Sequence, residues 1–359
     1  MKRVKQDRDF KHLPLGLLMI ALVFIGCKDR PTATSEEMQQ ITTLASIKGQ
    51  QLTGLTHSET GRMFANFPRW RPGVENSVTE VSPAGEFIAY PDETWNSWEI
   101  GDTITDSIFV AVQSVVASDN ELIVIDTRNP LFRGVQEQPI IFVFNLDSDE
   151  LKRAYPLTEG SFYRDSYIND VRIDRSRNRA YFTDSGHPGL VWLDLESGQS
   201  YRVLNEHTST SSEFDQLTIE GQAWGNGVHS DGIALDPGNK MLYYHALTGY
   251  TLYAVPTEVL SQSDEAIESA VRIIGKTVAP DGMIIDSQSN IYLADLEENR
   301  IVRYKLNTME EEELASGEGI HWADTFSIYQ GELYYTNSRI HETGSDISQM
   351  EFTINKIKI

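Results

Sequence analysis

A short frame that recurs along the chain constrains its fold more than any other feature of the sequence. The frame is clearest in two stretches, which read DGIALDPGNKMLYY (residues 231–244) and DGMIIDSQSNIYLAD (residues 281–295). Each begins with Asp-Gly, has a second Asp five residues later, turns, and continues into an apolar strand with aromatic residues. Looser copies bring the number to six, and the first positions of the copies, called the anchors below, are Thr53, Gln113, Asn169, Asp231, Asp281 and Asp324.

The spacing of the anchors predicts an all-β fold, a six-bladed β-propeller. The anchors are 43 to 62 residues apart, and repeats of roughly 40 to 50 residues built from short strands and turns are typical of propeller blades. Each copy predicts a hairpin, and apolar runs between the copies fit a third strand of each blade, at residues 140–147, 189–197, 251–256 and 300–306. The C-terminal run EFTINKIKI is expected to complete the last blade, and residues 263–275 to form a short helix. A parallel β-helix is the main alternative, but its repeats are shorter and more regular.

The N-terminus predicts an export signal followed by a tether. A basic start precedes an apolar run at residues 13–25 and then Gly26-Cys27, which is the pattern of a secretory signal over residues 1–26. The run is shorter than the roughly 20 residues that span a membrane. Gly-Cys resembles a bacterial lipobox, which implies that Cys27 is lipidated; an uncleaved anchor and an ordinary signal with an incidental cysteine stay open. Polar residues 27–44 would form the tether, and residues 45–359 the propeller.

These features predict an exported lipoprotein of the cell envelope, on the outer membrane at its periplasmic or surface face, that touches the membrane only through its lipid. The net charge of −23 repels phosphate backbones and argues against nucleic-acid binding. Cys27 is the one cysteine, so no disulfide forms within the chain. We expect a monomer.

The anchors share one kind of chemistry. All six side chains offer an oxygen atom, and three of them are carboxylates. In a propeller the innermost strand of each blade starts beside the central axis, so the anchors would converge near one mouth of the channel. Converging carboxylates raise the free energy unless something compensates them. A hard cation such as Ca²⁺, protonation, water or a cationic organic ligand would each do so. Taken singly, each Asp-Gly is also explained by a tight turn that enters a strand.

Aromatic and histidine side chains fall close to the same anchors in the sequence. Trp224 and Trp322 would supply an apolar wall, and His229 or His321 is a candidate general base, although each histidine alone is typical of a hydrogen-bonded loop residue. The predicted ligand site therefore comprises Gln113, Asn169, Asp231, Asp281, Asp324, Trp224 and Trp322. Pro68-Arg69-Trp70 is interpreted as blade packing away from the axis. No nucleophile-elbow, phosphate-loop, dinucleotide-binding or His-Glu-x-x-His motif is present.

Several motifs, in order, resemble the Yellow/major royal jelly protein family, which includes dopachrome-tautomerase-related and bacterial members. They read GRMFANFPRW, YPDETWNSWE, VQSVVASDNELIVIDT, INDVRID with AYFTDSG, DGIALDPGNKMLYY and HWADTFSI. The resemblance spans about residues 48 to 359 and implies a six-bladed propeller. It also implies diverse functions, among them pigment chemistry such as dopachrome conversion, and the binding of biogenic amines in the channel.

A more distant similarity links that family to the gluconolactonase and paraoxonase propellers, which hold Ca²⁺ or another divalent ion on the axis through Glu, Asn and Asp. The similarity implies a metal site at Asn169, Asp231 and Asp281. The first-blade Glu of those enzymes is not matched, because Thr53 and Gly54 stand there, and this departure argues against a lactonase.

Three functional hypotheses follow, and the residues leave open whether the chain is an enzyme. The first is a binding protein that holds a small organic ligand, cationic or aromatic, at the acidic mouth of its channel. The second is a metal-assisted enzyme, either a lactonase or hydrolase or an isomerase of the dopachrome type. The third is a non-catalytic interaction scaffold. The ligand, the reaction and the partner are not specified by the sequence.

Overall fold

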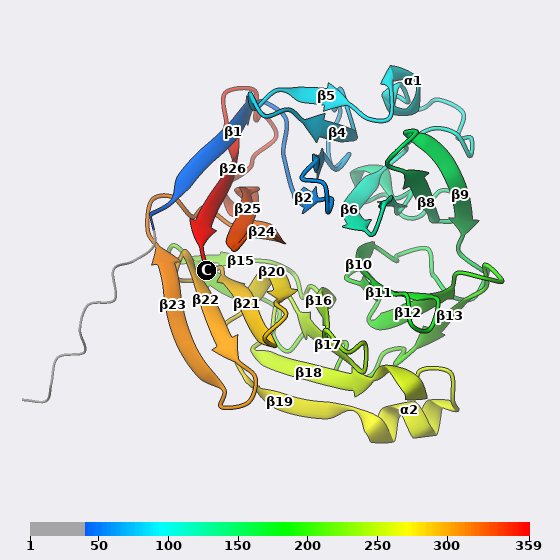
Figure 1. Cartoon of the computed structure of the whole chain (residues 1–359), viewed down its shortest axis with the longest axis vertical. Coiled ribbons are helices and arrows are strands. Elements are labelled where there is room, and N and C mark those ends of the chain that lie inside the picture. Colours follow the sequence, from blue (N-terminus) through cyan, green and yellow to red (C-terminus); the bar gives the residue numbers. More distant parts are fainter. Residues whose placement is uncertain (1–39) are drawn as a thin grey trace, which may run out of the picture. The chain divides into compact units, whose positions relative to one another are not determined.

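The computed structural model describes residues 40–359, and this range forms six four-stranded antiparallel sheets arranged as blades around a centre (Figure 1). The predicted six-bladed propeller is therefore confirmed. The predicted signal, the lipidation of Cys27 and most of the predicted tether lie outside the described residues. The first strand, β1, starts at Thr42, three residues before the start predicted for the propeller.

The first three blades follow one another along the chain, each with its strands in sequence order. Blade one contains β2 (Gly54–His57), β3 (Met63–Asn66), β4 (Val78–Val81) and β5 (Phe87–Ala89). Blade two contains β6 (Val112–Ser118), β7 (Glu121–Asp126), β8 (Ile140–Asn145) and β9 (Glu150–Pro156). Blade three contains β10 (Ile168–Asp174), β11 (Arg179–Asp184), β12 (Gly189–Asp194) and β13 (Ser200–Val203).

The remaining blades repeat this order, and the last one takes a strand from the other end of the chain. Blade four contains β16 (Ser230–Leu235), β17 (Met241–Ala246), β18 (Thr251–Pro256) and β19 (Arg272–Lys276). Blade five contains β20 (Pro280–Ile285), β21 (Asn290–Asp295), β22 (Arg300–Lys305) and β23 (Glu310–Ser316). Blade six contains β24 (Ala323–Tyr329), β25 (Glu332–Asn337), β26 (Glu351–Lys358) and β1 (Thr42–Lys48).

Short elements connect the blades and decorate their loops. They are the hairpin β14 (Leu217–Ile219) and β15 (Gln222–Trp224), the helices α1 (Glu93–Asn96) and α2 (Asp264–Ala270), and the 3-10 helices η1 (Pro130–Phe132), η2 (Thr257–Val259) and η3 (Ile340–Glu342). The short helix predicted at residues 263–275 is confirmed in part, because α2 covers Asp264–Ala270 whereas Arg272–Lys276 form β19. Among residues 40–359, no helix has the length and apolar character that crossing a membrane requires.

The ring is closed by pairing the two ends of the described chain. The predicted last strand, β26, lies third in blade six, and β1 pairs antiparallel with it as the outermost strand, with Ala45 opposite Ile354 and Lys48 opposite Glu351. Because β1 covers the free edge of β26, the sixth blade has the same number of strands as the others. The sequence frame did not predict this pairing, since β1 precedes the first copy.

The hydrophobic cores lie between neighbouring blades. Phe64 of β3 packs in one cluster with Phe142 of β8, and Ile123 of β7 in another with Phe182 of β11. Each of these four side chains is at most 2% exposed, and burying such a side chain stabilises the fold by about 1.5–3 kcal/mol. Because each core is shared, a blade depends on both neighbours for its burial.

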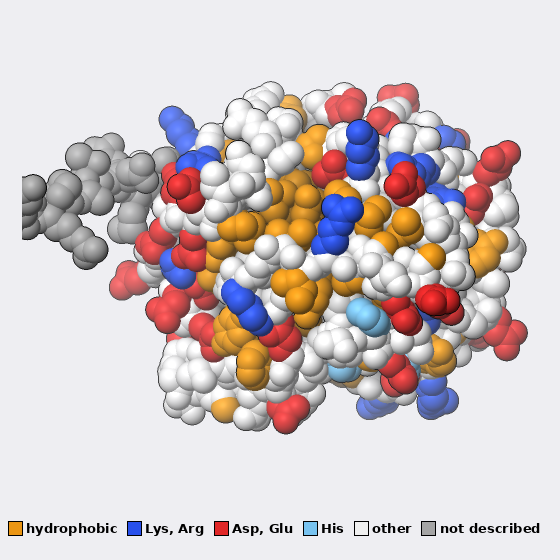
Figure 2. Space-filling model, turned by 90° about the horizontal axis from the view of Figure 1, so that it is seen from below, with side chains coloured by type: hydrophobic (Ala, Val, Ile, Leu, Met, Phe, Trp, Pro, Cys, Tyr) orange, Lys and Arg blue, Asp and Glu red, His pale blue; other side chains and the backbone are white. Residues whose placement is uncertain are grey.

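The outer strands carry the more exposed surface. Figure 2 views the propeller from below Figure 1, where β18, β19 and α2 form the edge, and hydrophobic side chains gather on that side. Ile273 of β19 is 72% exposed. The innermost strands, by contrast, surround the axis, and their starting residues form the candidate site.

Candidate functional site

Five of the six anchors lie where the innermost strand of a blade begins, and there the pairing with the second strand shifts register. The shift falls at Gln113 in β6, Asn169 in β10, Asp231 in β16, Asp281 in β20 and Asp324 in β24. A β-bulge of this kind turns a side chain out of the regular alternation and is common next to binding sites. The predicted position of these anchors beside the axis is explained by the bulge.

Gly232 and Gly282, which follow two of these anchors, are required because a side chain there would clash with the neighbouring strand, not because the chain turns. A Cβ atom on Gly282 would lie 2.8 Å from the carbonyl oxygen of Asp324 in the next blade, and one on Gly232 would lie 3.1 Å from Cβ of Met283. Neither glycine has a positive φ. The Asp-Gly pair thus combines an axial side chain with the close approach of neighbouring innermost strands, and the tight-turn explanation is wrong for these copies.

The second Asp of the frame has a different role. Oδ1 of Asp286 accepts hydrogen bonds from the backbone N–H groups of Gln288 and Asn290, both at 2.8 Å. Oδ2 of Asp286 accepts from Tyr292 Oη at 3.0 Å. Asp236 accepts in the same way from two backbone N–H groups of its own turn. These acids hold the hairpin turns, so only the first Asp of each copy is available to a ligand.

A cavity of about 870 Å³ lies over the axial ends of the innermost strands. This volume is typical of small-molecule sites. Five anchors line it, together with aromatic, apolar and cationic side chains; the anchors are Gln113, Asn169, Asp231, Asp281 and Asp324. The sixth, Thr53, does not line the cavity: its side chain is buried and its Oγ1 accepts from Asn66 Nδ2 at 3.2 Å.

A chain of hydrogen bonds runs across the floor of the cavity. Trp70 Nε1 donates to Tyr167 Oη, and Tyr167 Oη donates to Gln113 Oε1 at 2.8 Å. Gln113 Nε2 then donates to Asn169 Oδ1 at 2.7 Å. The amide of Asn169 in turn hydrogen-bonds the carboxyl of Asp231. Each link fixes the rotamer of the next side chain, so the floor is preorganised.

The three axial carboxyls are buried together, and this changes their protonation. Burial is the main cause that raises the pKa of Asp281. The hydrogen bond from Trp322 lowers this pKa and the charge of nearby Asp170 raises it, and the result is a pKa of about 7. Burial and the neighbouring Asp281 carboxyl raise the pKa of both Asp231 and Asp324 well above the usual range. Like charges held in an apolar setting resist joint ionisation, so burial favours the protonated forms of these acids.

Aromatic side chains form the walls. Trp322 donates from Nε1 to Asp281 Oδ2 at 2.5 Å, and its ring packs on Trp224 with 4.5 Å between the ring centroids. Both predicted tryptophans therefore line the cavity. On another part of the wall, Phe132 packs against Trp70 and Tyr167, with 5.7 and 5.1 Å between the ring centroids.

Two of these wall residues have a strained backbone. Trp322 has φ of 61° and Phe132 has φ of 53°, in the left-handed region that bulky residues rarely adopt. Phe132 is nevertheless 61% exposed. Strain that presents an exposed aromatic ring to a cavity is typical of ligand sites.

The prediction that Trp70 packs between blades away from the axis is wrong. Trp70 lies beyond the end of β3, lines the cavity and takes part in the hydrogen-bond chain of its floor. Arg69 does have the structural role: its guanidinium donates to the carbonyl oxygens of Val110 and Val74. Sequence reasoning also missed Tyr167, in the loop before β10, and Phe132, in η1 between β7 and β8, because the repeated frame gives no register in these connections.

The two predicted histidines are not among the described residues that line the cavity. His229 Nδ1 accepts from the backbone N–H of Ser212 at 3.1 Å, and burial lowers the pKa of His229. His321 lies 3.3 Å from Glu342 and bonds the carbonyl oxygen of Glu318. Both contacts are those of hydrogen-bonded loop residues, so the role of general base stays a prediction that the geometry does not support.

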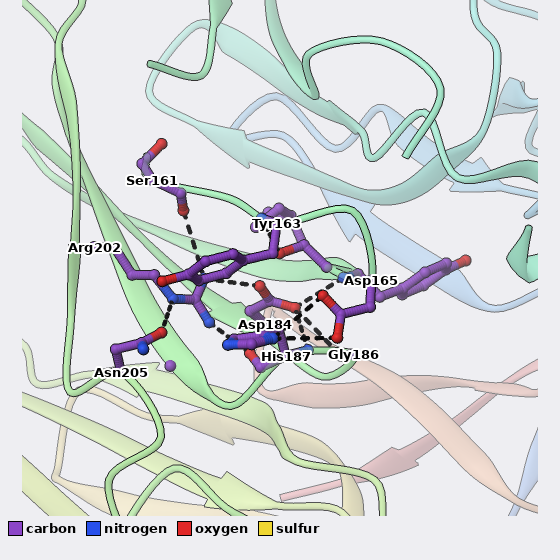
Figure 3. Close-up of polar contacts among 12 residues, drawn as sticks. Ser161, Tyr163, Asp165, Asp184, Gly186, His187, Arg202 and Asn205 are labelled. Carbon is purple, nitrogen blue, oxygen red and sulfur yellow. Dashed lines mark hydrogen bonds and ion pairs between the residues drawn. The ribbon is translucent and has the colours of Figure 1, made fainter. Parts of the chain in front are cut away.

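A third histidine, His187, contacts a residue of the cavity wall (Figure 3). Its Nδ1 lies 3.2 Å from both carboxylate oxygens of Asp165, which lines the cavity. Its ring packs on Tyr163 with 4.1 Å between centroids. The sequence pattern gave no reason to select His187.

Behind this wall lies a buried ion pair of blade three, also shown in Figure 3. Asp184, at the end of β11, accepts from Arg202 Nη1 of β13 at 2.9 Å, and both side chains are at most 4% exposed. The other oxygen of Asp184 accepts from the backbone N–H groups of Tyr167, Gly186 and His187. One carboxylate therefore fixes two loops of the cavity wall.

The predicted metal set is already engaged in hydrogen bonds. Asn169 Oδ1 accepts from Gln113, and Asp281 Oδ2 accepts from Trp322. Within residues 40–359, no group of three or more His, Cys, Asp or Glu side chains is arranged to hold a metal ion. The arrangement does not favour a cation at Asn169, Asp231 and Asp281, and Ca²⁺ binding stays a prediction.

The fold and the cavity define a class of protein: a six-bladed propeller with a ligand-sized axial cavity that has an acidic floor and aromatic walls. Within that class, the chain belongs to the major royal jelly protein family, whose family model matches residues 111–359. Protein yellow of Drosophila yakuba is 28% identical over 231 residues, a match that covers 58% of this chain and 41% of the fly protein. The match thus spans less than half of the fly protein. The predicted resemblance is confirmed.

Solved structures of the same fold are more distant. A luciferin-regenerating enzyme is 13% identical with a TM-score of 0.57, and the alignment covers 89% of this chain and 95% of that enzyme. A gluconolactonase from Xanthomonas campestris is 13% identical with a TM-score of 0.55, and the alignment covers 89% of each chain. At these identities the likeness shows the fold alone.

Proposed function

We propose that this propeller binds a small aromatic molecule in its axial cavity, with a hydrogen-bond-donating or cationic group of the ligand placed on the acidic floor. The observation that carries the proposal is that one cavity of about 870 Å³ combines buried carboxyls at its floor with aromatic side chains on its walls, of which Phe132 is 61% exposed. Ligand sites typically combine apolar walls with a few fixed polar groups.

The floor is suited to an amine or a phenolic hydroxyl. Asp281, with a pKa of about 7, accepts a hydrogen bond or a positive charge at neutral pH. Trp322 holds its Oδ2 in place and presents its ring beside the same carboxyl. An aromatic ring next to a carboxylate attracts a cation through both charge and the ring quadrupole.

We also propose that the protein acts outside the cytoplasm, held at the cell envelope by a lipid on Cys27. The support is the sequence pattern of residues 1–27 alone. Incorporation of a labelled fatty acid into the wild type and its loss in Cys27→Ala tests this part independently of ligand binding.

A fluorescence titration tests the binding proposal. Tyramine, dopamine, catechol and phenol are added to the purified protein, because three cavity tryptophans report on occupancy: Trp70, Trp224 and Trp322. We expect quenching with a dissociation constant well below about 1 mM for at least one amine. The response should be lost in Trp322→Phe and kept in Trp192→Phe, since Trp192 does not line the cavity. No saturable response below that concentration would refute the proposal.

The metal-assisted enzyme remains a second candidate, motivated by the three converging carboxyls and by a fold shared with a gluconolactonase. Its test is metal content, together with the melting temperature before and after EDTA. About one divalent ion per chain and a lower melting temperature after chelation would favour it, and lactone and ester substrates would then be screened. If the protein holds no divalent ion and EDTA does not change its melting temperature, the metal-assisted enzyme is refuted and metal-free ligand binding is the function that stays proposed.

A further inference from the structure

The cavity that has acids at its floor also has three arginines. Arg71, Arg133 and Arg164 line it, in a chain with 53 acidic and 30 basic side chains. None of the three forms an ion pair with a carboxylate of residues 40–359. Most other arginines of this range do, for example Arg62 with Glu80 at 2.7 Å. Where carboxylates are so abundant, arginines of a cavity that lack an ion pair are suited to a partner from outside residues 40–359.

The loops that present Arg133 and Arg164 are fixed to one another. The backbone N–H of Val135 donates to the carbonyl oxygen of Arg164 at 2.7 Å. Gly134 has φ of 92°, and a Cβ there would lie 3.1 Å from that carbonyl oxygen and 3.2 Å from Cγ of Arg164. Asn129 accepts from Gly134 N at 2.8 Å and donates to Ser166 O at 3.0 Å. The loop after β7 and the loop before β10 therefore form one unit that carries both guanidinium groups.

Two of the acids that line the same cavity are bonded to other residues rather than to these arginines. Asp165, the neighbour of Arg164, directs both carboxylate oxygens to His187 (Figure 3). Asp281 at the floor is bonded to Trp322. Arg71 donates to the amide oxygen of Gln51. The cavity thus has buried carboxyls at its axial floor, and the exposed side chains of Arg133 and Arg164, with Asp165 beside them, on its loops.

We propose that Arg133 and Arg164, assisted by Arg71, recognise a carboxylate of the ligand, so that the ligand class is an aromatic acid whose other end carries a hydroxyl or amine for the floor. Guanidinium groups match carboxylates geometrically and form charge-assisted hydrogen bonds. The inference rests on the proposed function, because it concerns the same cavity. It goes beyond it by assigning residues that select for negative charge.

Calorimetric titration with three matched probes tests the assignment. The probes are 3-(4-hydroxyphenyl)propionate, its neutral amide, and tyramine. We expect the wild type to bind the carboxylate more tightly than the amide. Replacing both arginines (Arg133→Gln with Arg164→Gln) should weaken binding of the carboxylate probe roughly 10-fold, the size expected of two solvent-accessible charge contacts. The affinity for the amide probe should change less than about 2-fold. Arg272→Gln serves as the matched control, since Arg272 is exposed and does not line the cavity.

Charge reversal separates recognition from misfolding. Arg133→Glu with Arg164→Glu should invert the preference, so that tyramine binds more tightly than the carboxylate, and a misfolded protein would not gain an affinity. A wild type that binds the amide or tyramine but shows no preference for the carboxylate would overturn this inference while leaving the proposed function standing. A wild type that binds none of the three probes would overturn both.

Discussion

Asp281 and Asp286 come from one copy of the frame, five residues apart, but their surroundings shift their pKa values in opposite directions. Asp281 is buried among other carboxyls, and its pKa is raised to about 7. Asp286 is only partly buried, and hydrogen bonds from Asn290, Tyr292 and Gln288 lower its pKa. In the sequence both residues are aspartates of the same repeat. Their different roles become visible only in the structure, where the bulge places Asp281 on the axis and leaves Asp286 in the turn.

Replacing Asp286 with Ala is expected to lower the free energy of unfolding by about 2–3 kcal/mol. The change removes an acceptor of several hydrogen bonds within one turn, each worth about 1 kcal/mol net. Urea unfolding measures the loss. Ligand affinity should not change, and a variant with wild-type stability would contradict the role assigned to this acid.

Replacing Asp281 with Asn is expected to change how stability depends on pH. Because the pKa of Asp281 in the folded protein is about 7, against the usual 3.8 of an aspartate, its contribution to stability is fully present below pH 4 and is lost as the pH rises to about 7. The wild type should therefore lose stability relative to Asp281→Asn over this window, by up to about 4 kcal/mol. Urea unfolding of both proteins at pH 4.5, 6 and 8 gives the difference. A constant difference would show that Asp281 is ionised throughout.

At the scale of single elements, the sequence predicted strands well and loops poorly. The hairpins, the third strands and α2 follow from local pattern, because alternation and turn residues are set within a few positions. The cavity walls at Trp70, Phe132 and Tyr167 come from loops whose conformation depends on partners 35 to 97 residues away. No periodicity reports such contacts, which is why Trp70 was assigned to the wrong environment.

The Asp184–Arg202 ion pair is the element-scale support of that wall. Arg202→Met leaves the Asp184 carboxylate buried without its charged partner, and breaking a buried pair typically costs about 3–5 kcal/mol. We expect a melting temperature several degrees lower, together with weaker ligand binding, because Tyr167 and Gly186 are held by the same carboxylate. Arg179→Met is the control, since Arg179 forms no ion pair within residues 40–359. Equal melting temperatures for the two variants would contradict this account.

At the scale of the whole propeller, stability depends on closing the ring. The number of blades followed from the six copies of the frame, but the pairing of β1 with β26 did not, because β1 carries no copy and its partner lies more than 300 residues away. Long-range antiparallel pairing is decided by which edge is left free, and that is a property of the assembled ring.

Deletion of β1 tests this closure. A chain that begins at residue 50 lacks the outer strand of blade six, whereas one that begins at residue 40 retains it. We expect the shorter chain to have a much lower melting temperature and to aggregate, since it exposes the edge of β26. The longer chain should melt like the full-length protein. Equal stability of the two would show that closure through β1 is dispensable.

The central claim is that the acidic floor of the axial cavity binds the polar end of an aromatic ligand. The most direct measurement is a calorimetric titration of tyramine at pH 8 into the wild type, Asp281→Asn and the turn variant Asp286→Asn. The account predicts one site in the wild type, at least roughly 10-fold weaker binding in Asp281→Asn, as for the loss of a partly buried charge contact, and unchanged binding in Asp286→Asn. Equal affinity in all three proteins would place the ligand elsewhere and contradict the claim.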